Sequence, residues 1–317
     1  MMLNKRKVVI VGTGMVGMSF AYALLNQNVC DELVLIDINK KRAEGEAADL
    51  NHGVAFSSSS MRIYAGTYND CSDADIVAIC AGANQKPGES RLELLQRNTA
   101  VFKSIVGPVV RSGFGGVFLV ATNPVDIMTR ITCELSNFNP SRVVGTGTTL
   151  DSARLRYLVG DYFGVDPRNV HAYVIGEHGD SEFVPWSQAL ISTKRITDIV
   201  EKSGEQYSLE DLDKISSMVR GAAQHIIEAK GATYYGIGMA MVRIAKAILQ
   251  NQNSVLTVSV RLRGEYGKKG VFIGNPAIIN KNGVDRTIEL ELTPDELERM
   301  ENSCNLLDDC FNSIELI

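Results

Sequence analysis

The segment 7–17 limits the possible folds of this chain more than any other part of the sequence. Residues 7–11 form a mainly β-branched run, and residues 12–17 read Gly-Thr-Gly-Met-Val-Gly, a G-x-G-x-x-G pattern. Residues 15–26 then have the character of a helix, and Asp37 ends the following strand-like run. A buried strand, a glycine turn, a helix and a second strand in this order form a βαβ unit, so we expect a parallel sheet.

The glycines and the carboxylate each have a physical role in such a unit. Gly12 permits a tight turn, Gly14 lets a pyrophosphate approach the backbone, and Gly17 lets the helix pack closely on the strand. The helix N-terminus offers free N–H groups to the phosphates. Asp37 can accept hydrogen bonds from both ribose hydroxyls and would repel a 2′-phosphate, which favours NAD over NADP. The alternative is a structural turn with Asp37 as a helix cap, which the complete βαβ context disfavours.

Further runs extend the alternation of strands and helices. Strands are predicted at 33–37, 75–79 and 116–120, and a helix is predicted at 92–111. Strands separated by helices indicate an α/β fold with a doubly wound parallel sheet of the Rossmann type.

The second half of the sequence has a different pattern of predicted helices and strands. A long helix is predicted at 209–230, with antiparallel-looking strands near 254–260 and 284–291. These features predict an α+β domain built against the first one. The expected domains are 1–147 and 148–317. No Pro/Gly-rich linker separates them, so we expect one rigid body.

Length and composition argue against several classes of protein. The 317 residues suit about two domains. The formal net charge of −5 disfavours a general nucleic-acid binder, because phosphate backbones need an excess of cations. No apolar stretch reaches the roughly 18 residues of a membrane helix, and no export signal is evident. The six cysteines form no C-x-x-C pair, so we expect a cytoplasmic protein without disulfides.

Polar loops follow two of the predicted strands. The segment 80–91 leaves the strand at 75–79, and the segment 121–126 leaves the strand at 116–120. Carboxyl ends of parallel strands share one edge of the sheet, so the ligand crevice is expected there. The first loop contains glycines and ends in Arg91, as a lid would need. A solvated loop with Arg91 as a surface charge is the alternative.

Asp151 and Arg154 stand three residues apart in a predicted helix and therefore share one helical face. An exposed salt bridge within the helix is the commoner meaning of such a pair. The sharper interpretation is that both side chains point into the crevice and have separate tasks there.

His178 is one of only four histidines and lies in the segment 176–180, Gly-Glu-His-Gly-Asp. The flanking glycines permit an unusual backbone and a close approach of a ligand. A turn residue is an equally simple interpretation. The neighbouring carboxylates suggest a metal, but the further ligands that a metal site needs are not evident, so we expect no metal.

This ordered set of motifs resembles the lactate/malate dehydrogenase family over essentially the whole chain, and within it the bacterial L-lactate dehydrogenases. The resemblance implies reversible hydride transfer between NADH and pyruvate, which gives L-lactate and NAD. The motifs that carry it are 12–17, Asp37, 81–91, 121–126, 151–154, 176–180 and 230–233.

The resemblance implies four catalytic roles, and the chemistry of the residues agrees with them. Protonated His178 would polarise the pyruvate carbonyl and donate a proton to it, a task that suits an imidazole with an ordinary pKa of about 6.5. Asp151 would bind the other ring nitrogen and fix the tautomer. Arg154 would clamp the substrate carboxylate through two parallel hydrogen bonds. Arg91 would stabilise the charge that develops on the carbonyl oxygen.

The resemblance also implies the remaining contacts of the site. Asn123, Asp126 and Thr233 would lie near the substrate, and Asn123 would also hold the nicotinamide. The residues expected along NAD are Gly12, Gly14, Val16, Gly17, Asp37, Arg42, Tyr68, Gly82, Ala83, Ser104, Thr122 and Asn123.

Gln85 decides the substrate within this family. Malate dehydrogenases carry arginine at the matching position, where it pairs with the second carboxylate of oxaloacetate. A neutral glutamine would leave that carboxylate unpaired, so pyruvate is favoured. A malate dehydrogenase is thus the rival within the family. A catalytically silent NAD-binding sensor is disfavoured, because it would not need the four catalytic candidates together. An NAD-dependent glycosidase is also disfavoured, because it would need a cluster of metal ligands that is not evident in the sequence.

Arg156 and His171 suggest a second site. Arg156 is two residues beyond Arg154 and therefore points roughly 200° away from it around the helix. In bacterial lactate dehydrogenases regulated by fructose 1,6-bisphosphate, an arginine and a histidine at matching positions bind the phosphates across a subunit interface. The resemblance thus implies an allosteric homotetramer in which binding weakens as His171 loses its charge. The alternative is a surface arginine and a partly buried histidine.

Overall fold

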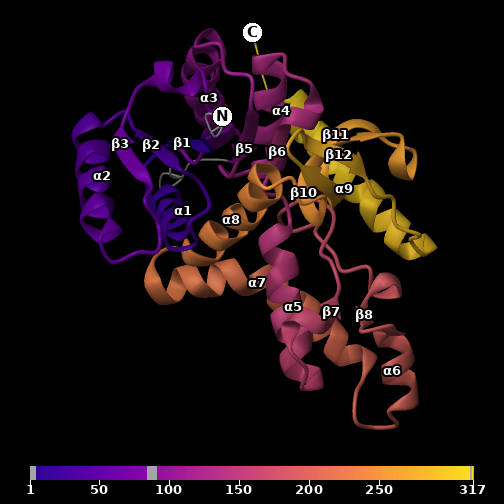
Figure 1. The fold of residues 1–317 in the computed structure, drawn as a ribbon. Coiled ribbons are helices and arrows are strands. Elements are labelled where there is room, and N and C mark those ends of the chain that lie inside the picture. Colours follow the sequence, from indigo (N-terminus) through magenta and orange to yellow (C-terminus); the bar gives the residue numbers. More distant parts are fainter. Residues whose placement is uncertain (1–4, 84–90, 315, 317) are drawn as a thin grey trace.

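The computed structural model describes residues 5–83, 91–314 and 316, without the side chain of Arg91. Within these residues nine strands form one sheet, in the order β12-β11-β10-β6-β5-β4-β1-β2-β3 (Figure 1). The strands of this sheet are β1 (Lys7–Val11), β2 (Glu32–Ile36), β3 (Arg62–Ala65), β4 (Ile76–Ile79), β5 (Val117–Val120), β6 (Val143–Gly145), β10 (Ser254–Arg263), β11 (Lys269–Asn280) and β12 (Gly283–Thr287).

The strands β3-β2-β1-β4-β5-β6 are parallel and form a doubly wound sheet. The chain passes from β1 outward through β2 to β3 and then returns to β4 on the other side of β1. The strand order therefore reverses between β1 and β4. Ligands of doubly wound sheets bind outside the carboxyl ends of the strands at such a reversal. The predicted α/β fold is confirmed.

The sheet does not stop at the end of the parallel part. Gly145 of β6 pairs with Ser259 of β10 in an antiparallel bridge, and β10, β11 and β12 continue as an antiparallel meander. One sheet thus runs through both of the predicted domains.

Helices cover both faces of this sheet (Figure 1). Phe20 of α1 and Met241 of α8 lie in the core on one face, whereas Phe102 of α3 and Met300 of α9 lie in the core on the other. Strands buried on both faces explain why their sequences are continuous apolar runs. The helices are α1 (Met15–Asn26), α2 (Lys40–Val54), α3 (Arg91–Arg111), α4 (Val125–Ser136), α5 (Thr149–Phe163), α6 (Ile196–Lys202), α7 (Leu209–Lys230), α8 (Tyr235–Leu249) and α9 (Pro294–Asn312).

A smaller lobe with its own core extends from the sheet (Figure 1). Leu155 of α5, Ile196 of α6 and Val219 of α7 meet in this core. A short antiparallel sheet completes the lobe, with strands β7 (Val170–His171), β8 (Leu190–Ile191) and β9 (Lys194–Arg195).

Most of the predicted elements are present, but the structure differs from the prediction in some strands. The strand expected near 284–291 is β12, which ends at Thr287. Residues 171–175 also have the composition of a strand, but they contain only the end of β7, and Ile175 makes an isolated bridge to Phe183. The long strand β11 was not predicted. None of the helices in the described parts of the chain is long and apolar enough to cross a membrane. All six cysteines are free.

The tight contact between β1 and α1 leads to a stability prediction. A Cβ atom on Gly17 would overlap the carbonyl oxygen of Gly12 and approach the Ile10 side chain, whereas a Cβ atom on Gly14 meets no heavy atom within 4 Å. We expect Gly17→Ala to lower the free energy of unfolding by roughly 1–3 kcal/mol. Gly14→Ala is the matched control, with a change within about 0.5 kcal/mol. Urea unfolding followed by circular dichroism measures both, and equal stabilities would contradict the assigned packing.

Candidate active site

The glycine turn lies at the carboxyl end of β1, beside the end of β4. Gly12 has a φ of +101°, and a Cβ atom there would lie 2.6 Å from the backbone nitrogen of Ala81. Only glycine fits this position. The open space next to Gly14 leaves the first turn of α1 accessible, so its backbone N–H groups can face the phosphates of a ligand.

Asp37 is held as a carboxylate beside this turn. Its Oδ2 accepts hydrogen bonds from the Thr13 backbone nitrogen at 2.8 Å and from Thr13 Oγ1 at 2.9 Å. Its Oδ1 accepts one from the Asn39 backbone nitrogen at 2.9 Å. Burial acts to raise the pKa of Asp37, but these donors and the charge of Arg42 lower it below the ordinary value. An ionised acceptor in this place fits the ribose hydroxyls of NAD.

Other residues predicted to bind NAD lie on α1, on a 3-10 helix and on α3. Val16 is in the first turn of α1, and Tyr68 begins the 3-10 helix Tyr68–Cys71. Burial raises the pKa of Tyr68, and the negative charge of Asp37 acts in the same direction. Ser104 is an exposed residue of α3.

Asn98 of α3 joins the two loops that leave β4 and β5. Its Oδ1 accepts a hydrogen bond from the Ala83 backbone nitrogen at 2.7 Å, and its Nδ2 donates to the Asn123 carbonyl oxygen at 3.1 Å. Thr122 Oγ1 donates to the Ala81 carbonyl oxygen at 2.8 Å. Sequence reasoning missed Asn98, whose only signal is a polar residue on the apolar face of a predicted helix.

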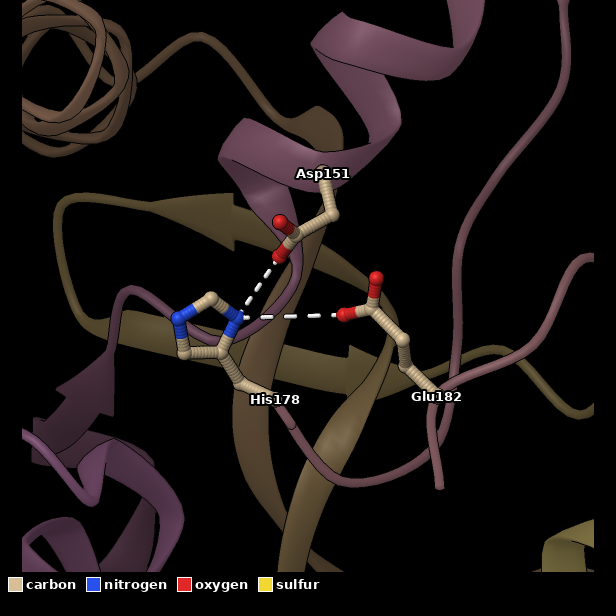
Figure 2. A group of neighbouring side chains, drawn as sticks. All are labelled: Asp151, His178 and Glu182. Atoms are coloured by element: carbon tan, nitrogen blue, oxygen red, sulfur yellow. Dashed lines mark hydrogen bonds and ion pairs between the residues drawn. The ribbon is translucent and has the colours of Figure 1, made fainter. Parts of the chain in front are cut away.

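The side chains of His178, Asp151 and Arg154 form one hydrogen-bonded group, of which Figure 2 shows Asp151 and His178. Nδ1 of His178 lies 2.7 Å from Oδ2 of Asp151, and NH1 of Arg154 donates to Oδ1 of Asp151 at 2.8 Å. The Asp151 side chain is only 2% exposed, whereas that of His178 is 25% exposed. Nε2 points away from the carboxyl groups in Figure 2, so it can reach a substrate.

The surroundings of His178 favour the protonated imidazole. Burial acts to lower its pKa, but the charge and hydrogen bond of Asp151 outweigh this, and the pKa is raised to about 9. Asp151 in turn keeps a lowered pKa despite its burial, mainly because of His178. The ordinary imidazole pKa assumed from the sequence is therefore too low, and the proton is held throughout the neutral range.

The predicted substrate residues have different places in this group. Oδ2 of Asp126, at the start of α4, accepts a hydrogen bond from the His178 backbone nitrogen at 2.8 Å and so fixes the loop that carries the imidazole. Thr233 lies half-buried in the short link between α7 and α8. The pair of Asp151 and Arg154 is a salt bridge within α5, yet the guanidinium has further N–H groups for a carboxylate. Gln85 and the side chain of Arg91 lie outside the described residues.

Glu182 is a member of the group that sequence reasoning missed. Its Oε2 lies 3.9 Å from Nδ1 of His178, and its side chain is 4% exposed (Figure 2). Burial raises its pKa to about 8, and the charge of Asp151 acts in the same direction. The only signal in the sequence is a carboxylate four residues after His178, within a loop that has no regular periodicity.

Asp151, His178 and Glu182 each offer a ligand atom, and these atoms lie within 4.8 Å of one another. Both oxygens of Asp151 are already engaged, one by His178 and one by the cationic Arg154. A divalent cation would be repelled by that guanidinium and would have to displace its hydrogen bond. The arrangement thus favours proton chemistry over metal binding.

Arg156, one of the two residues predicted for a second site, contacts the segment that follows His171. Nε of Arg156 donates to the Ala172 carbonyl oxygen at 3.4 Å, and its guanidinium lies 5.6 Å from the centre of the Tyr173 ring. His171 is exposed and directly precedes Ala172 and Tyr173 in the sequence. Burial lowers the pKa of Arg243, and the positive charge of Arg156 acts in the same direction.

Comparison with known proteins places both halves of the chain in one family. Residues 6–145 match the NAD-binding domain of the lactate/malate dehydrogenases, and residues 148–315 match their alpha/beta C-terminal domain. The L-lactate dehydrogenase 2 of Bacillus cereus is 56% identical over 301 residues, covering 95% of this chain and 96% of that protein. The L-lactate dehydrogenase of Bacillus velezensis is 55% identical over 310 residues, covering 97% and 98%. The structure of the minor L-lactate dehydrogenase from Enterococcus mundtii in the ligands-bound form has a TM-score of 0.97 at 48% identity, covering 99% of this chain and 100% of that one.

The bond between His178 and Asp151 leads to a prediction for the titration of the imidazole. Replacing Asp151 by asparagine removes the charge that raises the His178 pKa, while burial and the Arg154 cation remain. We expect Asp151→Asn to lower the His178 pKa by about 2 units or more. Titration followed by ¹⁵N NMR measures it, with His178→Gln to assign the signal among the four histidines. Asp161→Asn, an exposed charge on the same helix, is the control. An unchanged His178 pKa in Asp151→Asn would refute the assigned cause.

Proposed function

The chain belongs to the lactate/malate dehydrogenase family, and we propose that it catalyses the reversible reduction of pyruvate by NADH, which gives L-lactate and NAD. The activity is that of its L-lactate dehydrogenase relatives. The cofactor is NAD, and the open side of Gly14 and the ionised Asp37 fit its pyrophosphate and ribose. The single observation that carries the reaction is the hydrogen bond between His178 and the buried Asp151.

His178 holds and transfers the proton in this mechanism. Asp151 accepts the Nδ1–H, so the imidazolium is stabilised and Nε2–H is directed to the crevice. Nε2 gives its proton to the carbonyl oxygen of pyruvate, and the C=O bond becomes the C–OH of lactate. Bound NADH supplies the hydride to the carbonyl carbon. In the direction of lactate oxidation, neutral His178 takes the hydroxyl proton back.

The remaining residues orient the substrate and hold the loop. The free N–H groups of the Arg154 guanidinium clamp the substrate carboxylate. Arg91 acts on the carbonyl oxygen. Asn123, Asp126 and Thr233 line the substrate pocket, and Asp126 supports this by fixing the backbone of His178.

The site draws on both halves of the chain, and we divide them by function at 1–147 and 148–317. The first domain binds NAD and the second carries His178, Asp151 and Arg154. The sheet is continuous between the two domains, which supports a fixed position of bound NAD relative to His178.

Substrate choice rests on Gln85, which gives a direct test of the reaction. We expect NADH oxidation by the wild-type chain to be far more efficient with pyruvate than with oxaloacetate, because a neutral residue leaves the second carboxylate unpaired. Gln85→Arg is expected to raise kcat/KM for oxaloacetate at least about 100-fold relative to pyruvate. Gln96→Arg, an exposed position on α3, adds the same charge outside the site and is the control. Equal efficiency of the wild type with both substrates would overturn the assignment.

Fructose 1,6-bisphosphate is the activator that we propose for the second site. Arg156, Arg243 and the exposed His171 supply cations for its phosphates. The enzyme is a homotetramer in this proposal. Exposed apolar side chains on the paired helices α1 and α8, such as Tyr22 and Met239, support a face that another copy covers. We place the enzyme in the cytoplasm, where its six free cysteines would stay reduced.

The activator proposal leads to a prediction for Arg156. Fructose 1,6-bisphosphate is expected to lower the half-saturating pyruvate concentration of the wild type about 10-fold. Arg156→Gln removes a charge from the site, so the activator's effect is expected to fall to less than about twofold. Arg168→Gln is the control, because Arg168 is exposed and pairs with Asp166. Steady-state kinetics with and without the activator measure all three chains, and an undiminished response in Arg156→Gln would contradict the proposal.

A further inference from the structure

Glu182 is a buried carboxyl group that the mechanism above does not use. It lies on the loop that carries His178, and its Oε2 is 3.9 Å from the same ring nitrogen that Asp151 binds (Figure 2). The two carboxyl groups thus approach one Nδ1 atom from different directions, but only Asp151 is at hydrogen-bond distance.

The two carboxyl groups have unequal support. Asp151 receives hydrogen bonds from His178 and Arg154, so its charge is compensated. Among the described residues, no hydrogen bond reaches the side chain of Glu182, and its closest cation is the imidazole itself. A buried carboxylate without donors is unstable, so Glu182 holds its proton more readily than Asp151 does.

The charges that face these groups come from several elements. Asp151 and Arg154 on α5 and Arg220 on α7 act on Glu182, together with His178 of its own loop. Asp126 on α4 acts on His178, together with Asp151 and Glu182. Burial raises the pKa of Asp126 to about 6 and that of Glu182 to about 8, so of these two carboxyl groups Glu182 gains its charge further into the alkaline range.

We propose that Glu182 is a positioning residue for the acid–base step, which sets how far into the alkaline range His178 keeps the proton that it gives to the substrate. The inference rests on the proposed role of His178. Its physical content is electrostatic: the Glu182 charge appears beside Nδ1 and stabilises the imidazolium without touching the substrate.

The two groups titrate in overlapping ranges. The pKa of Glu182 is raised to about 8 and that of His178 to about 9. When Glu182 is ionised, its negative charge at 3.9 Å from Nδ1 opposes the loss of the imidazolium proton. The pair titrates as a coupled unit. Without the carboxyl group, His178 would become neutral at a lower pH.

Titration of His178 by ¹⁵N NMR tests this in the full-length chain and does not require activity. We expect Glu182→Gln to lower the His178 pKa by about 1 unit or more. Glu182→Asp keeps the charge and is expected to stay within about 0.5 unit of the wild type. Asp180→Asn is the matched control, because it removes an exposed carboxylate of the same loop that solvent screens. An unchanged or raised His178 pKa in Glu182→Gln would overturn the proposal.

A second measurement needs no variant and covers the case in which Glu182→Gln does not fold. The wild-type ¹⁵N signals of His178 are expected to move in two steps, the first when Glu182 ionises and the second when the imidazole loses its proton. A single-step curve would overturn the proposal.

Kinetics then connect the titration to turnover. In Glu182→Gln the alkaline decline of kcat/KM for pyruvate is expected to begin at a pH about 1 unit lower than in the wild type. A shifted NMR titration in a chain that does not reduce pyruvate would leave the electrostatic role intact and reject the proposed reaction instead.

Discussion

The hydrogen bond between His178 and Asp151 is the interaction on which the rest of the site depends. It joins the loop that carries His178 to helix α5, and each of its two residues is fixed by a further hydrogen bond. Arg154 binds the second oxygen of Asp151, and Asp126 binds the backbone of His178. Because Asp126 starts the helix that follows β5, the position of the imidazole is set by the parallel sheet itself. Fold and chemistry are therefore connected through four side chains and a few short hydrogen bonds.

Local charge, not net charge, explains how an acidic protein handles anionic ligands. The chain carries a formal charge of −5, yet the proposed substrate and cofactor sites present the Arg154 cation, a protonated His178 and the N-terminus of α1. Buried carboxylates beside these cations raise the imidazole pKa, and they repel an anion only weakly where they are themselves paired. The sign of a whole chain says little about the potential inside one crevice.

The sequence predicts the parallel sheet well, because this sheet depends on local patterns of apolar residues and glycines. The run 7–11 and the helices 15–26 and 209–230 match the structure from end to end. The residues that it does not predict act through contacts between distant segments. Asn98 joins two loops from the side of α3, and the role of Glu182 depends on burial by other elements. The raised His178 pKa is likewise a property of three-dimensional neighbours and has no local signature.

The antiparallel bridge between Gly145 and Ser259 has a consequence for solubility. Residues 1–147 would form a nearly complete nucleotide-binding unit if they were cut from the rest, but β6 would then lack the strand β10 that covers it. Val143 and Val144 are fully buried in the intact chain. In the fragment β6 would be an unpaired, apolar edge strand. Such edges pair with strands of other copies and promote aggregation. The second half of the chain therefore also acts as a built-in cover that keeps the first half from self-association.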